Sequence, residues 1–546
     1  MEKIIAFLAN NWWWFTPVIF LLSVAIHDIF IQKKHTIKHN FPIVGHFRYM
    51  LERIGPELRQ YIVANNREEL PFNRSQRSWI YASSKRENNY QSFGTDQDIY
   101  APGHIFIHPT MFPFSGGKDH PNIKDPYFLP CAKVMGAYNK RRRPFRPYSI
   151  VNISGMSYGS LSSNAVTALN KGSLKVGCYQ NTGEGGLSPF HRHGADVMFH
   201  FGTGYFGVRD EKGNFSFEQM DKLVKENPFI RAIEVKLSQG AKPGKGGVLP
   251  ASKITREIAE IRGVPMGQDA LSPSTHSAFS NVREMVDFLE RIADITGLPV
   301  GFKSAVGKME MWEELTDLML ETGKGPDFIT IDGGEGGTGA APPAFADHVS
   351  LPFIYAFSNV YKIFAKKGLA ERVVFIGSGK LGLPAKAMMA FAMGCDIVAV
   401  AREAMMSIGC IQAQSCHTNT CPAGVATQNK WLAAGLDPTL KSERAANYIR
   451  TLRKEILEIT HACGYEHPCQ LTMNDVDISM GDNNLTQTLR NTYHYDKEQV
   501  RFKNMQSLLT CQYLGGPGPQ KTTNDSKSKL SEQGISSLSI EPEEVA

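Results

Sequence analysis

Short apolar runs alternate with amphipathic stretches from about Tyr148 onward, and this alternation predicts strands separated by helices. Helical spacing of apolar residues is clearest in Val282–Thr296 and Trp312–Thr322. Eight strands, each followed by a crossover, predict an α/β fold, a (β/α)8 TIM barrel over residues 148–430. An open doubly wound sheet is the alternative. The runs that fit strands are Ser149–Ile153, Cys178–Asn181, Ala232–Lys236, Val264–Gly267, Pro299–Lys303, Phe328–Asp332, Arg372–Ile376 and Asp396–Val400.

Trp12–Ile31 is a nearly continuous apolar run near the beginning of the sequence. Its length matches the roughly 20 residues that a membrane-spanning helix needs, although His27 and Asp28 interrupt it. Three lysines follow the run, so the positive-inside rule places the rest of the chain in the cytoplasm. Charges on that side do not fit a cleaved signal peptide. We expect one transmembrane anchor in residues 1–35; a hydrophobic helix docked on the protein body is the alternative.

The remaining segments lie on either side of the predicted barrel. Residues 36–147 are irregular, polar and rich in aromatic residues, which predicts a segment that wraps the barrel without chemistry of its own. Residues 431–515 predict a helical extension in which Asp437 caps one long helix, Asp437–Cys463. Residues 516–546 are rich in Ser, Lys, Glu and Gly, which predicts a disordered tail.

Composition narrows the classes of function. The chain has 546 residues, of which 42% are hydrophobic and 21% charged, values that are ordinary for a globular protein. The net charge of +6 is small and no basic stripe is interleaved with aromatic residues, so nucleic acid is not an expected partner. The nine cysteines form no disulfide framework, which fits a reducing compartment and a cytoplasmic catalytic part.

The densest chemical motif is Cys410–Thr427, CIQAQSCHTNTCPAGVAT. Cys410, Cys416 and Cys421 lie close together in it, and a proline follows the last of them. Thiolates are the preferred ligands of iron–sulfur clusters, so the spacing favours such a cluster. A zinc site that adds His417, or three unrelated buried thiols, are the alternatives.

Small residues and glycines follow the first, sixth, seventh and eighth predicted strands. Small residues after the first strand would let a flat ring lie against the backbone. Loops after strands seven and eight of such barrels often bind phosphate through backbone N–H groups, which indicates a phosphorylated cofactor such as FMN. Tight turns are the alternative. The candidate residues are Ser154, Gly155, Met156, Ser157, Asp332, Gly333, Gly334, Gly377, Ser378, Gly379, Ala401 and Arg402.

Charged and amide side chains also follow predicted strands. Arginine binds a carboxylate through a bidentate fork and lysine binds it as a point charge, so the cations after the third strand suit a dicarboxylate substrate. A lysine at the end of the fifth strand could stabilise a reduced flavin, and a glutamate after the second could serve as an acid–base or ammonia-binding group. Each of them alone would also fit an exposed surface residue. These residues are Glu184, Lys236, Gln239, Lys242, Arg262 and Lys303.

Together these stretches closely resemble the FMN-binding synthase domain of glutamate synthases. The matching motifs are SGMSYGS, TGEGG, KLSQGAKPGKGG, DGGEGGTGA and GCIQAQSCHTNTCPAGVATQ, in the family's order. The resemblance implies FMN and a 3Fe-4S cluster held by Cys410, Cys416 and Cys421. It implies that ammonia adds to 2-oxoglutarate, that the 2-iminoglutarate formed accepts hydride from reduced FMN, and that L-glutamate leaves. Electrons would reach the flavin through the cluster.

The resemblance also implies roles for individual residues. The FMN contacts would be Ser154, Gly155, Met156 and Ser157, with Lys303 at the ring, and Gly334 and Gly379 would lie near the phosphate. The contacts to 2-oxoglutarate would be Lys236, Gln239, Lys242 and Arg262, with Glu184 near the ammonia entry.

The sequence departs from the family in four respects. Val248 stands where the family usually has Gln, another substrate contact, and Ser272–His276 replaces a proline- and histidine-rich stretch. No amidotransferase domain with a cysteine nucleophile precedes the barrel, and no NADPH-binding domain is evident. We therefore expect ammonia to be free or supplied by another subunit. Electrons would come from a ferredoxin-like protein, a reductase subunit or a membrane donor.

Two other functions fit these departures. The same cofactors could act on another keto or imino acid, as Val248 suggests. The chain could also be a non-catalytic, membrane-tethered electron-transfer protein, although such a carrier would not need the cationic residues.

Overall fold

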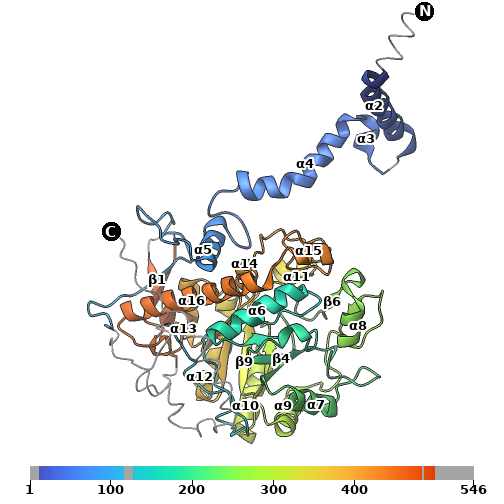
Figure 1. The fold of residues 1–546 in the computed structure, drawn as a ribbon. Helices are drawn as coiled ribbons and strands as arrows, with labels where there is room; N and C mark the ends of the chain where they lie inside the picture. The colour runs from blue at the N-terminus through green and yellow to red at the C-terminus, as the bar shows by residue number, and fades with distance from the viewer. Residues whose placement is uncertain (1–11, 33, 116–126, 482–484, 498–546) are drawn as a thin grey trace, which may run out of the picture. The chain divides into compact units, whose positions relative to one another are not determined.

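Eight parallel strands close into a barrel (Figure 1). The computed structural model describes residues 12–32, 34–115, 127–481 and 485–497. The strands follow one another around the barrel in chain order, and the last pairs with the first. This arrangement confirms the predicted (β/α)8 fold. The strands are β2 (Val151–Ile153), β3 (Gln180–Asn181), β4 (Val197–Phe201), β5 (Ile230–Lys236), β8 (Val300–Ser304), β9 (Phe328–Asp332), β10 (Val374–Ser378) and β11 (Ile397–Val400).

One of the eight predicted strands was wrong. Val264–Gly267 forms a turn after helix α8 (Arg256–Arg262), because Pro265 cannot donate to a strand ladder and Gly267 has a φ of +75°. The missing third strand is β4, which is buried along its whole length. Lys236 therefore ends the fourth barrel strand and not the third.

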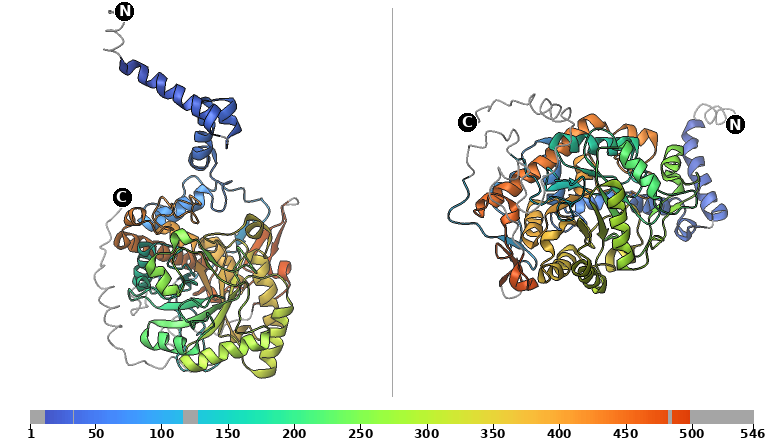
Figure 2. Two further views of the ribbon diagram at one scale, coloured as in Figure 1. Left: turned by 90° about the vertical axis from the view of Figure 1, so that its right-hand side faces the viewer. Right: turned by 90° about the horizontal axis from the view of Figure 1, so that it is seen from below.

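Helices lie outside the strands (Figure 2). The predicted helix Val282–Thr296 is α9, which begins where Asn281 Oδ1 accepts the Glu284 N–H and ends at Gly297. The predicted Trp312–Thr322 lies within α10. The helices between barrel strands are α6 (Ser163–Val176), α7 (Phe217–Glu226), α8, α9 (Val282–Thr296), α10 (Glu310–Thr322), α11 (Pro343–His348), α12 (Phe353–Lys366) and α13 (Pro384–Met393).

The long helix predicted after the barrel is α16 (Pro438–Ala462), with Asp437 as its N-cap. It packs along α6 (Figures 1 and 2), and Gly172 permits the close approach because a Cβ there would lie 2.8 Å from Ala445 Cβ. Shorter helices near it are α14 (Arg402–Ser407), α15 (Lys430–Ala434) and α17 (Leu489–Tyr493).

The part of the chain after residue 431 also contains strands. β12 (Val476–Ser479) pairs antiparallel with β1 (Ile105–Ile107) and with β13 (Thr486–Thr488). This three-stranded sheet joins segments from before and after the barrel. The predicted tail, residues 516–546, lies outside the described residues.

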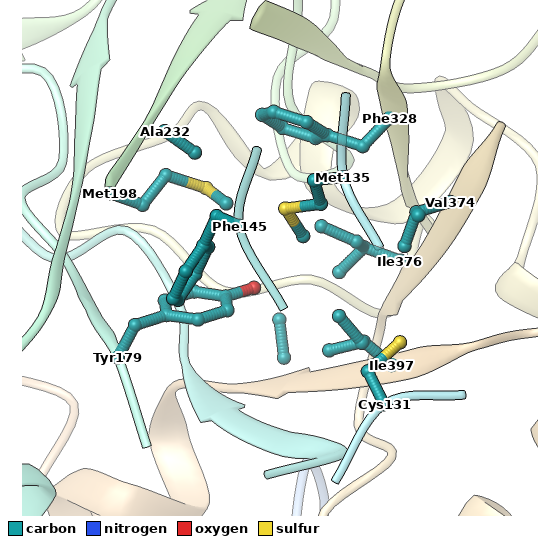
Figure 3. Close-up of a cluster of buried hydrophobic side chains, with 11 residues drawn as sticks. Cys131, Met135, Phe145, Tyr179, Met198, Ala232, Phe328, Val374, Ile376 and Ile397 are labelled. Atoms are coloured by element: carbon teal, nitrogen blue, oxygen red, sulfur yellow. The ribbon is translucent and has the colours of Figure 1, made fainter. Parts of the chain in front are cut away.

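Apolar side chains from the segment before β2 close the amino-terminal end of the barrel (Figure 3). Met135 and Phe145, which pair through a backbone bridge, are buried among residues at the beginnings of barrel strands, including Phe328 and Val374. Burying each such side chain stabilises the fold by about 1.5–3 kcal/mol. This end of the barrel is therefore a packed core, and the opposite end is left for chemistry.

The chain divides into two compact units, Met1–Arg77 and Ser78–Ala546. In the described part of the first unit, one helix, Trp13–Ile31, is long and apolar enough to cross a membrane by length and composition. Asp28, which interrupts the apolar run, is buried and accepts a hydrogen bond from His46 Nε2 at 2.9 Å. The helices of this unit are α2 (Thr16–Ile26), α3 (Thr36–Asn40) and α4 (Val44–Leu58), and the division falls within α5 (Arg74–Lys85).

Candidate active site

The loops after β2 and β3 pack directly on each other at the carboxyl-terminal end of the barrel. A Cβ at Gly155 would lie 2.9 Å from Asn181 Oδ1. Gly183 has a φ of +64°, and a Cβ there would lie 2.5 Å from the backbone nitrogen of Ser157. Glycine is therefore required on both sides of this contact, in SGMSYGS and in TGEGG.

Glu184 and Lys236 form an ion pair between the ends of β3 and β5. Lys236 Nζ donates to Glu184 Oε2 at 2.5 Å and to Gln239 Oε1 at 3.3 Å. Burial opposes ionisation of Glu184, but the Lys236 ammonium outweighs it and lowers the pKa of this carboxyl to about 2. The carboxylate is therefore charged at neutral pH, and is suited to binding a cation rather than donating a proton.

Arg262 lies at the end of α8 and contacts the SGMSYGS loop. Its Nη2 donates to Ser157 Oγ at 3.3 Å and to the Tyr158 carbonyl at 3.1 Å. The guanidinium carbon lies 5.3 Å from the centre of the Phe206 ring. Arg262 Nε is buried and makes no hydrogen bond within the part of the chain that the structure describes. This N–H is available to an anionic ligand.

Four of the predicted site residues line one cavity: Ser157, Glu184, Lys242 and Arg262. Lys242 Nζ donates to the Ala340 carbonyl at 3.0 Å, and burial lowers the pKa of this lysine. Lys236 and Gln239 do not line the cavity and connect to it through Glu184.

The cavity also has lining residues beyond these four. Val248 lines it because β6 (Val248–Leu249) pairs with β7 (Ala270–Leu271). Thr338 belongs to the motif DGGEGGTGA, so the sequence could have indicated it as a lining residue. Phe206 lies in no motif that would have indicated it. The other residues of this kind are Ser160, Gly247, Leu249, Ala270, Ser272, Gly339 and Ala340.

Lys303 and Asp332 form a second ion pair, with Nζ and Oδ2 3.4 Å apart. Asp332 Oδ2 also accepts the Gly240 N–H at 2.9 Å. A Cβ at Gly240 would lie 1.9 Å from the Gly333 carbonyl oxygen, so the backbones approach too closely for any side chain. Lys303 is buried at its strand end rather than extended into solvent.

The glycine loops after β9 and β10 meet. The Gly333 N–H donates to the Ser378 carbonyl at 2.8 Å, and the Gly334 N–H to the Leu351 carbonyl at 2.8 Å. Gly379 has a φ of +144°, which a side chain would strain. Gly333 and Gly334 after β9 therefore lie beside Ser378 and Gly379 at the end of β10.

Arg402 reaches the same loop, where it donates to the Glu335 carbonyl. Ser154 N–H donates to the Val400 carbonyl at 2.9 Å, which places the SGMSYGS loop beside Ala401. Gly377 differs, because a Cβ there would meet Cys395 Sγ at 2.8 Å. It packs in the barrel wall, away from the other glycines.

The cysteine loop lies against the SGMSYGS loop. Gln428 Nε2 donates to the Gly159 carbonyl at 3.1 Å and to the Leu161 carbonyl at 2.8 Å. The thiols of Cys410, Cys416 and Cys421 interact electrostatically with one another. Within the described residues, no three His, Cys, Asp or Glu side chains form a group that could hold a metal ion. The iron–sulfur cluster and the zinc alternative both stay predictions.

Comparison with solved structures returns barrels of low similarity. A mandelate oxidase variant with a monooxide FMN adduct is 12% identical, with a TM-score of 0.40 over 81% of this chain and 99% of that chain. A flavocytochrome b2 variant with pyruvate bound is 13% identical, with a TM-score of 0.41 over 88% and 92%.

Comparison of sequences gives closer relatives. The glutamate synthase large subunit-like protein YerD of Bacillus subtilis (strain 168) is 40% identical over 491 residues, 84% of this chain and 93% of that protein. The archaeal glutamate synthase (NADPH) of Methanocaldococcus jannaschii is 34% identical over 58% of this chain and 59% of that protein. The ferredoxin-dependent glutamate synthase of Pyropia yezoensis is 30% identical over 61% of this chain and 22% of that protein.

Residues 128–466 match the model of the conserved region in glutamate synthase. This region contains the whole barrel, the charged cavity and the cysteine loop. Glutamate synthases are oxidoreductases acting on the CH–NH2 group of donors, and the chain belongs to the glutamate synthase family.

Proposed function

We propose that the chain catalyses the FMN-dependent reductive amination of 2-oxoglutarate to L-glutamate, with electrons relayed through an iron–sulfur cluster. The observation that carries the proposal is the cavity that Glu184, Lys242 and Arg262 share. It places two cations beside one carboxylate at the end of a barrel where such folds keep their chemistry.

The charges of this cavity support a dicarboxylate substrate. Lys236 and Glu184 neutralise each other, which leaves the positive charges of Lys242 and Arg262 for two carboxylates. Arg262 would bind one through its open N–H, and Lys242 would bind the other as a point charge. Glu184, which its lowered pKa keeps charged, would accept a hydrogen bond from ammonia beside the keto carbon that ammonia attacks.

The strand-end loops support FMN as the cofactor. Gly155, Gly183 and Gly333 let the loops after β2, β3 and β9 pack closely on their neighbours, because a Cβ at each would meet another residue. A flat ring could lie against the small residues of these loops. Lys303 is a buried cation near the end of β8, and Arg402 lies by the glycine loops that would hold the phosphate. Bound FMN would supply the hydride that reduces the imine. The chain's own part is to orient the substrate with Lys242 and Arg262 and to exclude water.

The cysteine loop supports an iron–sulfur cluster, which would supply one-electron transfer. Three neighbouring thiols, next to the SGMSYGS loop, match the donor set that such clusters prefer. An electron donor, such as a ferredoxin-like protein or a reductase subunit, would approach a surface cavity beside this loop. Ile411, Pro422, Leu432 and Lys441 are among the residues that line that cavity.

We also propose that Trp13–Ile31 anchors the chain in a membrane, with the barrel in the cytoplasm. Its length and composition support this, and most of the helix is exposed. The lysines that follow it in the sequence support the orientation.

Anaerobic stopped-flow mixing tests the reaction. Reduced protein mixed with 2-oxoglutarate and ammonium should show flavin reoxidation and yield one L-glutamate per flavin. If neither 2-oxoglutarate nor any other 2-oxo acid reoxidises the flavin, the proposal is contradicted. A non-catalytic electron-transfer protein would then be the remaining function.

A second candidate keeps both cofactors but changes the substrate. Val248, Leu249 and Phe206 give the cavity an apolar wall that favours a 2-oxo or imino acid with a less polar side chain. Reoxidation of the reduced flavin by 2-oxoisocaproate plus ammonium, faster than by 2-oxoglutarate, would favour this candidate.

A further inference from the structure

Lys253 is a buried cation between the two loops that would hold the cofactors. It ends the short turn Ala251–Lys253 and is 2% exposed. Its Nζ donates to the Ser160 carbonyl of the SGMSYGS loop at 2.9 Å. Its ammonium also interacts electrostatically with Cys416 and Cys421.

Hydrogen bonds fix this arrangement from two directions. Asn419 Nδ2, in the cysteine loop, donates to the carbonyl of Ser252 at 2.8 Å, next to the lysine. Gln428, at the end of the same loop, donates to the Gly159 and Leu161 carbonyls on either side of Ser160. Lys253 is therefore held in place by contacts that do not depend on its own charge.

The charge of Lys253 has no carboxylate to balance it among the described residues. The groups that interact electrostatically with its ammonium are Cys416, Cys421 and Arg262, and the last is itself a cation. Burying a charge without a counter-charge is costly, so such a lysine indicates an anionic partner at the site. A thiolate-ligated cluster carries negative charge, and Cys416 and Cys421 are near enough to interact electrostatically with the ammonium.

We propose that Lys253 raises the reduction potential of an iron–sulfur cluster bound by the cysteine loop and thereby makes the cluster a stronger acceptor of electrons from the external donor. The inference rests on the proposed function, because it needs the cluster. Reduction adds one electron and one negative charge. A fixed cation nearby stabilises the reduced form more than the oxidised form, and the low-dielectric surroundings strengthen this effect.

The test compares two variants of the full-length protein by EPR-monitored redox titration of the cluster. Lys253→Gln keeps a hydrogen-bond donor for Ser160 but removes the charge, and Lys253→Arg keeps the charge. We expect the Gln variant to shift the reduction equilibrium at least tenfold toward the oxidised form, a fall of about 59 mV for one electron. In the Arg variant the reduction potential should fall by less than half of that amount. Lys225→Gln, on the exposed surface of α7, removes an equal charge and should leave the potential unchanged.

The outcomes separate this inference from the proposed function. Equal potentials in wild type and Lys253→Gln, with iron content unchanged, would overturn the role of Lys253 alone. Loss of the cluster from both Lys253 variants would show a packing role and would also overturn it. Absence of iron and of an EPR signal from the wild-type protein, purified without oxygen, would overturn the cluster itself.

Discussion

Lys236 donates a 2.5 Å hydrogen bond to Glu184, and this pair ties the end of the fourth barrel strand to the loop after the second. The two residues are 52 positions apart in the sequence. They meet because the carboxyl ends of parallel strands share one rim of the barrel. The pair holds Glu184 in position, and Glu184 is the only carboxylate among the residues that line the charged cavity.

Removing the charge of Glu184 should destabilise the fold as well as the reaction. In Glu184→Gln, Lys236 would remain buried without its partner, which costs about 3 kcal/mol. Urea unfolding measures this loss, and the double variant with Lys236→Met should recover most of it. Equal stability of wild type and Glu184→Gln would contradict the prediction.

The same pair predicts how stability depends on pH. The pKa of Glu184 in the folded protein is about 2, below the ordinary value of 4.5, so the pair's contribution is complete above pH 4.5. It should be lost as the pH falls from 4.5 towards 2, because the unfolded state then binds the proton first. The difference in urea midpoint between wild type and Glu184→Gln should therefore shrink over this window. A difference independent of pH would argue against the ion pair.

Arg262 should be required for substrate binding. Arg262→Lys loses the planar fork and its open Nε–H, so we expect the KM for 2-oxoglutarate to rise at least tenfold, about 1.4 kcal/mol. Steady-state kinetics with saturating ammonium measures it. Arg256→Lys is the matched control, since Arg256 lies on the same helix with its side chain in solvent. An unchanged KM in Arg262→Lys would show that Arg262 does not bind the substrate.

Val248 should determine the choice of substrate. Val248→Gln restores an amide to the cavity wall, and one hydrogen bond contributes about 1 kcal/mol. We expect kcat/KM for 2-oxoglutarate to rise about fivefold relative to that for 2-oxoisocaproate. The measurement is the ratio of kcat/KM for 2-oxoglutarate to kcat/KM for 2-oxoisocaproate, in wild type and in Val248→Gln. The same ratio in both proteins would show that Val248 does not contact the substrate.

Cys416→Ala should abolish iron binding. A cluster held by three thiolates loses one of its ligands, so the iron content and the EPR signal of the cluster should disappear. Cys463→Ala, outside the loop, is the control and should retain both. Iron retained in the Cys416 variant would contradict the prediction that the cysteine loop binds the cluster.

The sequence by itself determined the class of fold and the chemistry at the strand ends. Barrel strands are buried on both faces, so they appear as short apolar runs, and the loops that follow them carry their glycines and charges locally. Such features are encoded within a few residues. That is why seven of the eight strands, α9, α16 and the residues Glu184, Lys242 and Arg262 could be named from the sequence.

Tertiary structure alone decided what depends on distant contacts. Val264–Gly267 and β4 are both short apolar runs, and only closure of the barrel selects the second as a strand. Gly377 resembles the other glycines in sequence, but it lies in the barrel wall, where a Cβ would meet Cys395 Sγ. Phe206 and Lys253 carry no local signal, because their surroundings come from loops far away in the chain. Local periodicity fixes which face of an element is buried, whereas the identity of the neighbour on that face is set by packing.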